Sequence, residues 1–519
     1  MDLKLMLEEA VGQYGDKTII VSGDHRLSYT DLDEASNKVA NTLIEIGVNK
    51  GDRVAMLLTN SPEFVISYYG IIKAGAIAVP LDPKYKINEL ASLFDDSLPR
   101  VVVSESPTLE PLVPALSKFK SIRHVIDLNS EYEGRFISYQ KIMAISSARR
   151  IELALEPEDV AHIAYTSGPT FHPRGIMLSH RCLVSEVAIS VEGFQQTEKD
   201  VMMSFSLPMH HMLGLIEVVL ASVYKGSTVV IVPGTGLSIG SFLAAIEREK
   251  GTVFLGVPYT FGLIADMAKE GGIKNDLSSF RLCGSAGAPL SIDILERFKR
   301  YCGFDLIDFW GLTEATCHVT CPPIDGTGKR GSVGKALRGC EVKIVDDKGR
   351  ELPPNQAGEI IFSGSTIMKG YYNNTQATTE VIKDGWLYTG DIGMVDEDGY
   401  LFLTDRKKEL IIVKGQNIFP SDIEGILYMH PKVAETAVLG IPDERRGEVV
   451  GAVISLKERK AATEQEIKQF CLERLANYKV PKQVVFLDSL PRTAAGKVDK
   501  ESIRRHLSIP SLFPEVVIS

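Results

Sequence analysis

The 519-residue chain lacks the features that mark membrane proteins, secreted proteins and nucleic-acid-binding proteins. It has no run of eighteen apolar residues, and its charged N-terminal segment MDLKLMLEEAVGQYGDK is unlike a signal peptide. Lys and Arg number 57 against 67 Asp and Glu, so the net charge is −10 and no basic excess is available to bind phosphate backbones. We therefore expect a cytoplasmic protein with no transmembrane segment and no nucleic-acid partner.

Cysteine is also scarce. The seven cysteines form an odd, scattered set, which fits reduced thiols in a cytosolic enzyme rather than a disulfide framework. One short cluster, Cys317-His318-x-x-Cys321, contains ligand types that zinc accepts. Because a structural zinc site needs four ligands and no second pair lies nearby, we interpret these cysteines as core residues.

Two common nucleotide-binding signatures are missing. The segment GTGKRGS around Lys329 has neither the spacing nor the final residue of a Walker loop, and GTGLSIG at 234–240 has one residue too many for a dinucleotide fingerprint. The chain is therefore predicted to be neither a P-loop protein nor a dinucleotide-binding one.

The composition and the apolar pattern predict a folded α/β protein of more than one domain. With 44% hydrophobic and 24% charged residues the chain is typical of globular proteins. Its length exceeds the number of residues that one hydrophobic core usually supports. Short β-rich runs at 54–58, 76–82, 100–104 and 124–128 alternate with helical patterns at 29–47 and 61–75, and a second cycle covers 227–258. This alternation favours largely parallel sheets, whereas the Gly- and Asp-rich turns after residue 330 favour antiparallel hairpins.

The run YTSGPTFHPRG, from Tyr165 to Gly175, is the strongest candidate for a phosphate-binding loop. It follows an apolar strand pattern, and its small hydroxyl residues and glycine can direct several N–H and O–H groups at one anion. Arg174 adds a planar fork of donors that matches phosphate oxygens.

The order of this run and six later motifs resembles the acyl-adenylate-forming superfamily, which includes acyl-CoA synthetases, aryl-CoA ligases, nonribosomal adenylation domains and beetle luciferases. The motifs extend over more than 300 residues and are YTSG…PRG, LPMHHMLG, GSAGAPL, FWGLTE, LYTGD, DRKKELI and PRTAAGK. The resemblance implies a large N-terminal domain, 1–405, of two α/β subdomains plus a β-subdomain. It also implies a small mobile α+β C-terminal domain, 406–519, with a hinge near Lys408.

The chemistry implied by the resemblance joins two anions, because a carboxylate oxygen attacks the α-phosphorus of ATP and pyrophosphate leaves. Such a site must supply cations and dipoles at the developing charge. Thr313 would contact the α-phosphate, and the hard oxygen ligands of Glu314 would bind Mg²⁺. The residues implied at the β- and γ-phosphates are Thr166, Ser167, Gly168, Thr170 and Arg174.

The resemblance also implies an adenosine site. Trp310 stands where the family usually has a tyrosine stacked on adenine, Asp391 would accept hydrogen bonds from the ribose hydroxyls, and Arg406 would support the same sugar. The remaining nucleotide-contacting positions implied by the match are Gly287, Ala288, Pro289 and Gly311.

In the C-terminal domain, Lys497 of PRTAAGK would bridge the attacking carboxylate and the phosphate oxygens in the transition state. Rotation at Lys408 would then withdraw Lys497 and bring Lys414 and Gly415 to the site for thioester formation with coenzyme A.

His211 matches the family histidine at the entrance of the acyl pocket. Tyr259, Phe261, 284–287 and the segment after Glu314 are further candidates for the wall of that pocket. We expect no basic residue among these positions, which favours an apolar acyl group that is fatty, alicyclic or aryl.

The leading interpretation is thus an AMP-forming acyl-CoA synthetase that uses ATP, Mg²⁺ and coenzyme A, as a monomer or a homodimer. Two alternatives remain open: an acyl-AMP ligase that delivers to a carrier-protein thiol, and a binding homologue with impaired ATP turnover.

The loop departs from the family pattern at three positions. Pro169 replaces a hydroxyl residue and removes an N–H donor, Phe171 replaces a glycine, and Arg174 replaces the usual lysine. Phe171→Gly is expected to change the affinity for ATP or pyrophosphate more than the preference among acids, because it restores backbone freedom only in this loop. Measuring KM for ATP, pyrophosphate and several acids checks this, and a change confined to the acids would contradict the loop assignment.

Overall fold

The computed structural model describes most of the chain. The residues covered are 1–129, 134–165, 174–232, 238–287, 290, 292–346, 348–406, 411–418, 420–443, 445–457, 460–491 and 503. The chain divides into two compact units, of which the larger contains 1–83, 94–165 and 174–406 and the smaller contains 84–93 and the described residues after 410. The expected domain boundary at 405/406 stays a prediction, and the expected hinge Lys408 lies outside the described residues.

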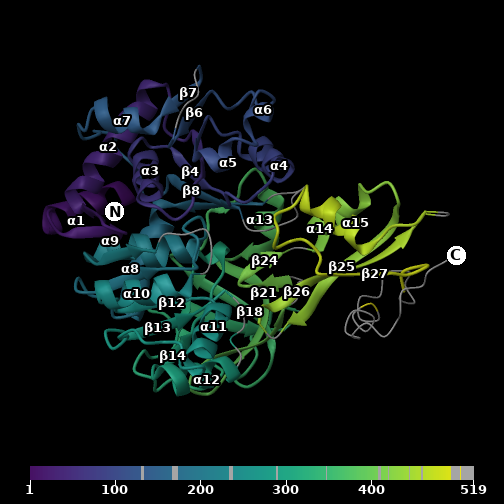
Figure 1. The fold of residues 1–519 in the computed structure, drawn as a ribbon. Helices are drawn as coiled ribbons and strands as arrows, with labels where there is room; N and C mark the ends of the chain where they lie inside the picture. The colour runs from purple at the N-terminus through teal and green to yellow at the C-terminus, as the bar shows by residue number, and fades with distance from the viewer. Residues whose placement is uncertain are drawn as a thin grey trace. The chain divides into compact units, whose positions relative to one another are not determined.

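The first sheet of the larger unit is parallel except for one hairpin at its edge. Its strands, in order, are β14 (Leu306–Asp308), β13 (Leu282–Ser285), β12 (Val253–Gly256), β10 (Val201–Ser204), β11 (Thr228–Ile231), β1 (Thr18–Ser22) and β2 (His25–Ser28). Only β1 and β2 pair antiparallel. The connecting helices α10 (Ile239–Glu249), α11 (Pro258–Lys269) and α12 (Ile292–Cys302) lie beside these strands in Figure 1.

The second sheet has a parallel body and an antiparallel edge. Its order is β19 (Gly370–Tyr371), β9 (Gly175–Ser179), β8 (Val160–Tyr165), β4 (Ile77–Pro80), β3 (Arg53–Leu57), β5 (Val101–Ser104), β6 (His124–Asp127) and β7 (Phe136–Ser138). β8, β9 and β19 pair antiparallel. Tyr165 pairs with Gly175, so the two ends of the predicted phosphate loop are neighbours in this sheet.

The third sheet forms the β-subdomain expected after residue 330. It contains β17 (Cys340–Val345), β18 (Gly358–Gly364), β21 (Trp386–Val395), β20 (Ile382–Lys383) and β22 (Leu401–Arg406), all antiparallel. A short pair, β15 (Thr320–Cys321) and β16 (Lys335–Ala336), precedes it. The predicted architecture of α/β parts plus a β-subdomain is therefore confirmed.

The smaller unit is α+β, as the sequence predicted. Its sheet has the order β24 (Gln416–Ile418), β23 (Ile411–Val413), β26 (Gly447–Leu456) and β25 (Val433–Asp443), and β27 (Gln483–Phe486) pairs with β26. Helices α14 (Pro420–Tyr428) and α15 (Glu464–Leu472) contribute apolar residues to the core of this sheet.

Helix boundaries follow local capping signals. α2 (Tyr29–Glu45) begins after Ser28, whose hydroxyl accepts from the Asp31 N–H while the Asp31 side chain accepts from the Ser28 N–H. α3 (Pro62–Lys73) begins with Ser61 as its N-cap and proline in its first turn.

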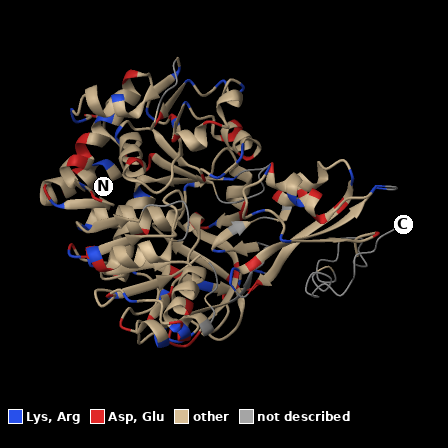
Figure 2. Cartoon of the chain, in the orientation of Figure 1, with Lys and Arg blue, Asp and Glu red and all other residues tan. Residues whose placement is uncertain are grey.

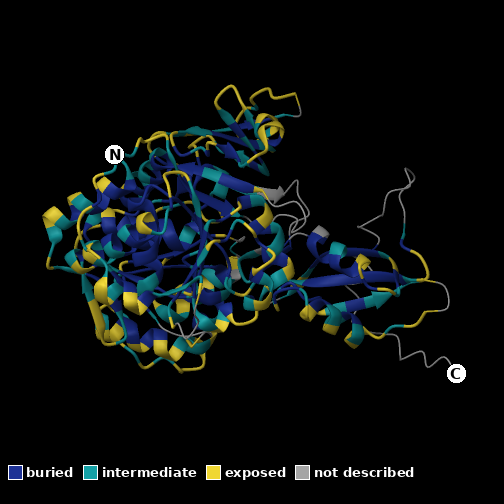
Figure 3. Cartoon of the chain, turned by 90° about the horizontal axis from the view of Figure 1, so that it is seen from above, coloured by how far each residue is buried: buried dark blue, intermediate teal, exposed yellow. Residues whose placement is uncertain are grey.

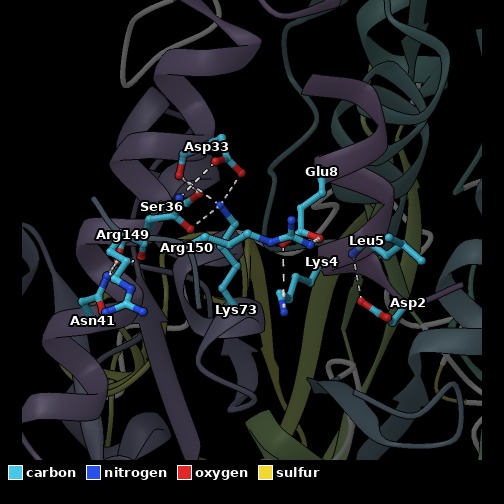
Figure 4. Close-up of polar contacts among 11 residues, drawn as sticks. Asp2, Lys4, Leu5, Glu8, Asp33, Ser36, Asn41, Lys73, Arg149 and Arg150 are labelled. Carbon is cyan, nitrogen blue, oxygen red and sulfur yellow. Dashed lines mark hydrogen bonds and ion pairs between the residues drawn. The ribbon is translucent and has the colours of Figure 1, made fainter. Parts of the chain in front are cut away.

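A buried lysine joins α2 and α3 (Figure 4). The Lys73 ammonium is 1% exposed and donates to the Asp33 carboxylate at 2.6 Å, the Asp33 carbonyl at 2.9 Å and the Asn37 side chain at 2.8 Å. Burial lowers the pKa of Lys73, and the Asp33 carboxylate opposes that shift. The exposed pair of Arg150 and Glu8 nearby contributes only about 0–1 kcal/mol, whereas loss of one partner from a buried pair costs several kcal/mol.

Buried and exposed residues are divided between the strands and the outer helices of the larger unit. Strands of the larger unit are mostly buried, and its outer helices carry exposed faces (Figure 3). Acidic and basic residues are interspersed over the helices (Figure 2). Within the described ranges, no helix is both long enough and apolar enough to cross a membrane.

Candidate active site

The loop after β14 is closed on itself and carries several of the predicted nucleotide residues. The Trp310 carbonyl accepts from the N–H groups of Val319 at 2.9 Å and Thr320 at 3.2 Å, so the intervening residues project from a fixed base. A Cβ at Gly311 would lie 1.9 Å from the Cys317 carbonyl oxygen. Only glycine therefore fits at position 311, and its predicted place in the site has a packing reason.

Trp310 and Asp391 contact one another directly, although they are 81 residues apart. The indole Nε1 donates to the Asp391 carboxylate at 3.1 Å, and the indole is 6% exposed. Asp391 lies on β21, where it pairs in register with Arg406 on β22. The fold thus brings Trp310 and Asp391 into contact and places the backbone of Arg406 beside Asp391, and the sequence predicted all three for one adenosine site.

Thr313 and Glu314 lie in one turn of 3₁₀ helix, η2 (Thr313–Ala315). The Glu314 carbonyl accepts from the Met368 N–H at 2.8 Å, and its carboxylate accepts from the Tyr371 hydroxyl at 2.9 Å. Burial and the adjacent Glu314 carboxylate raise the pKa of Tyr371. The hydroxyl therefore keeps its proton near neutral pH and remains a donor to Glu314.

Tyr371 is a candidate site residue that sequence reasoning missed. It lies on β19, and its ring centroid is 5.6 Å from the Arg174 guanidinium carbon. Gly370 before it has φ 140°, and the pair forms a two-residue strand beside β9. The Gly-Tyr-Tyr run just ahead of a helix is the available signal, but it belongs to none of the seven motifs that carry the resemblance.

Other predicted phosphate and nucleotide residues lie outside the described ranges. These are Thr166, Ser167, Gly168, Thr170, Ala288 and Pro289, together with Pro169 and Phe171. Gly287 follows the carboxyl end of β13 with φ 79°, and the N–H of Ala286 before it donates to the Gly256 carbonyl at 3.1 Å. The carboxyl ends of adjacent parallel strands are where α/β sheets usually bind ligands.

Comparison with known protein families agrees with this arrangement. Residues 7–372 match the model of the AMP-binding enzyme family, and residues 422–497 match the model of the AMP-binding enzyme C-terminal domain. The chain belongs to the AMP-binding enzyme family. The predicted resemblance to acyl-adenylate-forming enzymes is thereby confirmed.

Relatives of this AMP-binding enzyme are named CoA ligases, which supports the expected class of acid–thiol ligase. It is 32% identical to a long-chain-fatty-acid–CoA ligase of Bacillus subtilis, with 97% of this chain and 94% of the relative covered. It is also 32% identical to an oxalate–CoA ligase of Arabidopsis thaliana (96% and 98% covered) and 33% identical to 4-coumarate–CoA ligase 3 of Oryza sativa (96% and 91% covered).

Solved structures of similar fold include enzymes with different acceptors. The o-succinylbenzoate CoA synthetase of Bacillus subtilis has a TM-score of 0.85 at 29% identity, with 96% of this chain and 97% of that chain covered. The amide bond synthetase of Marinactinospora thermotolerans has a TM-score of 0.88 at 27% identity, with 98% and 100% covered.

His211 of the AMP-binding enzyme lies in a tightly held turn before the π-helix η1 (Leu213–Leu220). Asn60 holds the preceding residues, because it accepts from the Met209 N–H at 2.8 Å and donates to the Leu207 carbonyl at 2.7 Å. The ring centroids of His210 and His211 are 4.6 Å apart. A Cβ at Gly214 would lie 2.3 Å from the Pro208 carbonyl oxygen, so glycine is required for this close approach.

A buried charge cluster lies behind the loop that carries Trp310 and Glu314. The His318 Nδ1 lies 2.9 Å from the Glu217 carboxylate and 3.4 Å from the Glu186 carboxylate, and the His318 N–H donates to Glu186 at 2.8 Å. Burial opposes a charge on His318, but the two carboxylates outweigh it and raise the pKa of His318 to about 10. Burial raises the pKa of Glu186 to about 7.

This cluster changes one expectation and confirms another. The segment after Glu314 was expected to hold no basic residue, yet it holds His318, whose raised pKa favours the protonated imidazole between Glu186 and Glu217. Cys317 and Cys321 are buried thiols, as the core interpretation predicted. Because the imidazolium already pairs with both carboxylates, we interpret the four-residue group of Glu186, Glu217, Cys317 and His318 as an anchor of the loop.

In the smaller unit, Lys414 and Gly415 form the turn between β23 and β24, with φ 52° and 79°. The Lys414 N–H donates to the Arg446 carbonyl at 3.0 Å. Lys497 lies outside the described residues, so the catalytic and acceptor roles expected for this unit stay predictions.

The anchor predicts a pH-dependent contribution of His318 to stability. Because the folded-state pKa of about 10 lies above the ordinary value of 6.5, this contribution is complete below pH 6.5 and is lost as the pH rises toward 10. His318→Gln should lower the free energy of unfolding by about 3 kcal/mol near neutral pH, since two buried carboxylates lose their cation.

Melting temperatures of wild type and His318→Gln, measured from pH 6.5 to 10, test this prediction. The two curves should converge as the pH rises, whereas His25→Gln, at an exposed position, should parallel wild type. A constant offset of His318→Gln at every pH would contradict the charged anchor.

Proposed function

We propose that this protein is an AMP-forming acyl-CoA ligase that activates a carboxylic acid as an acyl-adenylate and transfers the acyl group to coenzyme A. The observation that carries the proposal is the arrangement around one closed loop. Trp310 at its start bonds to Asp391, and Glu314 within it bonds to Tyr371, which lies against Arg174. Groups suited to a base, a sugar, a metal ion and phosphates thus meet at the same loop.

In the first half-reaction, a carboxylate oxygen attacks the α-phosphorus of ATP, and the bond to the bridging oxygen of pyrophosphate breaks. The proposal assigns Arg174 to the β- and γ-phosphates together with Thr166, Ser167, Gly168 and Thr170. Thr313 contacts the α-phosphate. Trp310 and Asp391, supported by Arg406, hold adenine and ribose, and Gly287, Ala288, Pro289 and Gly311 allow close approach of the nucleotide. Positioning and charge stabilisation supply most of the catalysis in such a reaction.

The residues present fit a magnesium ion. Glu314 offers carboxylate oxygen, the ligand type that Mg²⁺ prefers, and the hydrogen bond from Tyr371 fixes its orientation. When bound, the ion would neutralise phosphate charge that otherwise repels the incoming carboxylate. Glu314 would hold it.

The second half-reaction needs a different set of groups. The proposal places the hinge at Lys408, assigns Lys497 to adenylate formation, and assigns Lys414 and Gly415 to the passage for the coenzyme A thiol. The thiol sulfur forms a bond to the acyl carbon, and AMP leaves with the bonding electron pair. Because the same small domain carries both sets, the two steps would use two arrangements in turn.

The acyl group is proposed to be apolar, with His211 at the entrance of its pocket. Two relatives support this class, since their names specify a long-chain fatty acid and 4-coumarate. Oxalate in the name of a third relative marks a polar acid of two carbons, so the test must include such acids.

One alternative function has specific support. The fold is as similar to an amide bond synthetase as to a CoA synthetase, with TM-scores of 0.88 and 0.85. An acyl-adenylate ligase that delivers to another acceptor, such as a carrier-protein thiol, would use the same first half-reaction.

The deciding experiment is acid-dependent exchange of labelled pyrophosphate into ATP over a panel of short, medium-chain, alicyclic, aryl and dicarboxylic acids. We expect exchange with at least one apolar acid and formation of its CoA thioester after coenzyme A is added. Exchange without a thioester would favour the alternative acceptor. Absence of exchange with every acid would exclude both adenylating functions.

Lys497→Ala should reduce adenylate formation by about a thousandfold, because one preorganised transition-state donor is worth that order of magnitude. The attack of coenzyme A on chemically prepared acyl-AMP should remain within a few-fold of wild type. Both rates are measured in single-turnover assays, with Lys500→Ala as a control for the loss of a nearby charge. Equal loss in both steps would contradict the assigned role.

A further inference from the structure

Tyr371 contacts two groups that the proposed function assigns to ATP. Its hydroxyl lies 2.9 Å from the Glu314 carboxylate, and its ring lies beneath the Arg174 guanidinium at 5.6 Å. The residue is only 4% exposed, and it comes from a strand that is 57 residues from Glu314 in sequence. One side chain therefore contacts both Glu314, the carboxylate proposed for the metal ion, and Arg174, the cation proposed for the phosphates.

The backbone of Tyr371 is fixed independently of its hydroxyl. β19 pairs with β9 through Gly370 with Met177 and Tyr371 with Ile176, and the Tyr371 N–H donates to the Thr378 hydroxyl at 2.9 Å. The next residue, Tyr372, donates its N–H to the Gly175 carbonyl at 2.6 Å. A change of the Tyr371 side chain alone should therefore leave this edge of the sheet in place.

The Glu314 main chain is also fixed, because its carbonyl accepts from the Met368 N–H at 2.8 Å. What the Tyr371 hydroxyl adds is the orientation of the carboxylate. On the other side, Arg174 is exposed and is the next-to-last residue of the predicted phosphate loop. A cation held over an aromatic face loses part of its freedom before it meets an anion.

We propose that Tyr371 is a positioning residue whose hydroxyl orients Glu314 for the metal ion and whose ring holds Arg174 for the phosphates. This inference rests on the proposed function, since that function assigns the roles of Glu314 and Arg174. The contact with Glu314 depends on the hydroxyl alone, whereas Arg174 also lies over the ring, so substitutions can separate the two roles.

Tyr371→Phe removes only the hydroxyl. It should raise the Mg²⁺ concentration for half-maximal pyrophosphate exchange about tenfold, the effect of losing one hydrogen bond to a charged group. The KM for pyrophosphate should stay within a factor of two, because the ring remains under Arg174. Tyr372→Phe removes the neighbouring hydroxyl and should match wild type in both quantities.

Tyr371→Leu removes the ring as well. It should show the same change in Mg²⁺ dependence and, in addition, a roughly threefold rise in the KM for pyrophosphate relative to Tyr371→Phe, the size expected for an exposed cation–π contact. When Arg174→Leu is added to each Tyr371 variant, the two double variants should have the same KM for pyrophosphate. The proposal is overturned if Tyr371→Phe leaves the Mg²⁺ dependence unchanged.

A second measurement separates this inference from the proposed function. Binding of Mn²⁺ to the full-length protein in the presence of ATP, followed by electron paramagnetic resonance, requires no turnover. Weaker Mn²⁺ binding in Tyr371→Phe than in wild type and Tyr372→Phe would support the role of Tyr371 even if no acid in the panel were activated. Equal Mn²⁺ binding in all three would refute it, whatever the activity.

Discussion

The pairing of one buried imidazolium with two buried carboxylates is the interaction on which the candidate site depends. His318 belongs to the loop that carries Trp310 and Glu314, whereas Glu186 lies on α8 (His180–Gly193) and Glu217 on η1. Charges in the interior are stable only when they are paired and hydrogen-bonded. The loop is therefore fixed on its buried side by the pairing of His318 with Glu186 and Glu217, which is directional, unlike an apolar contact. Its other side can remain polar.

This constraint explains how one loop could contact the several parts of a nucleotide that the proposed function assigns to it. The backbone bonds at Trp310 close the loop, the Gly311 contact sets its curvature, and the His318 anchor fixes its rear. The side chains of Trp310 and Glu314 can then each depend on one long-range partner, Asp391 and Tyr371. A rigid loop whose side chains each have one fixed partner is preorganised. A reaction between two anions requires such preorganised groups.

Much of the fold followed from local sequence. The alternation of β-rich runs and helical patterns predicted strands such as β3, β5 and β6 to within a residue at most ends, and the turn-rich segment after 330 predicted the antiparallel sheet. Motif order placed Trp310, Asp391 and Arg406 in one site before their contacts were known. Tyr371 and the anchor escaped prediction because their partners are 57 to 197 residues away and share no local periodicity with them. Pairing across such distances is set by sheet register and helix packing, which short motifs do not encode.

The direct pairing of Tyr165 with Gly175 has a consequence for substitutions in the segment between them. The two residues close the base of a hairpin, so the strands on either side hold their register without help from the residues between them. In a segment attached in this way, proline can replace a hydroxyl residue and phenylalanine can replace a glycine without a change to the hydrogen bonds of the parallel strands. Pro169 and Phe171 thus belong to a segment between two paired residues, and substitutions there are expected to have little effect on the stability of the larger unit.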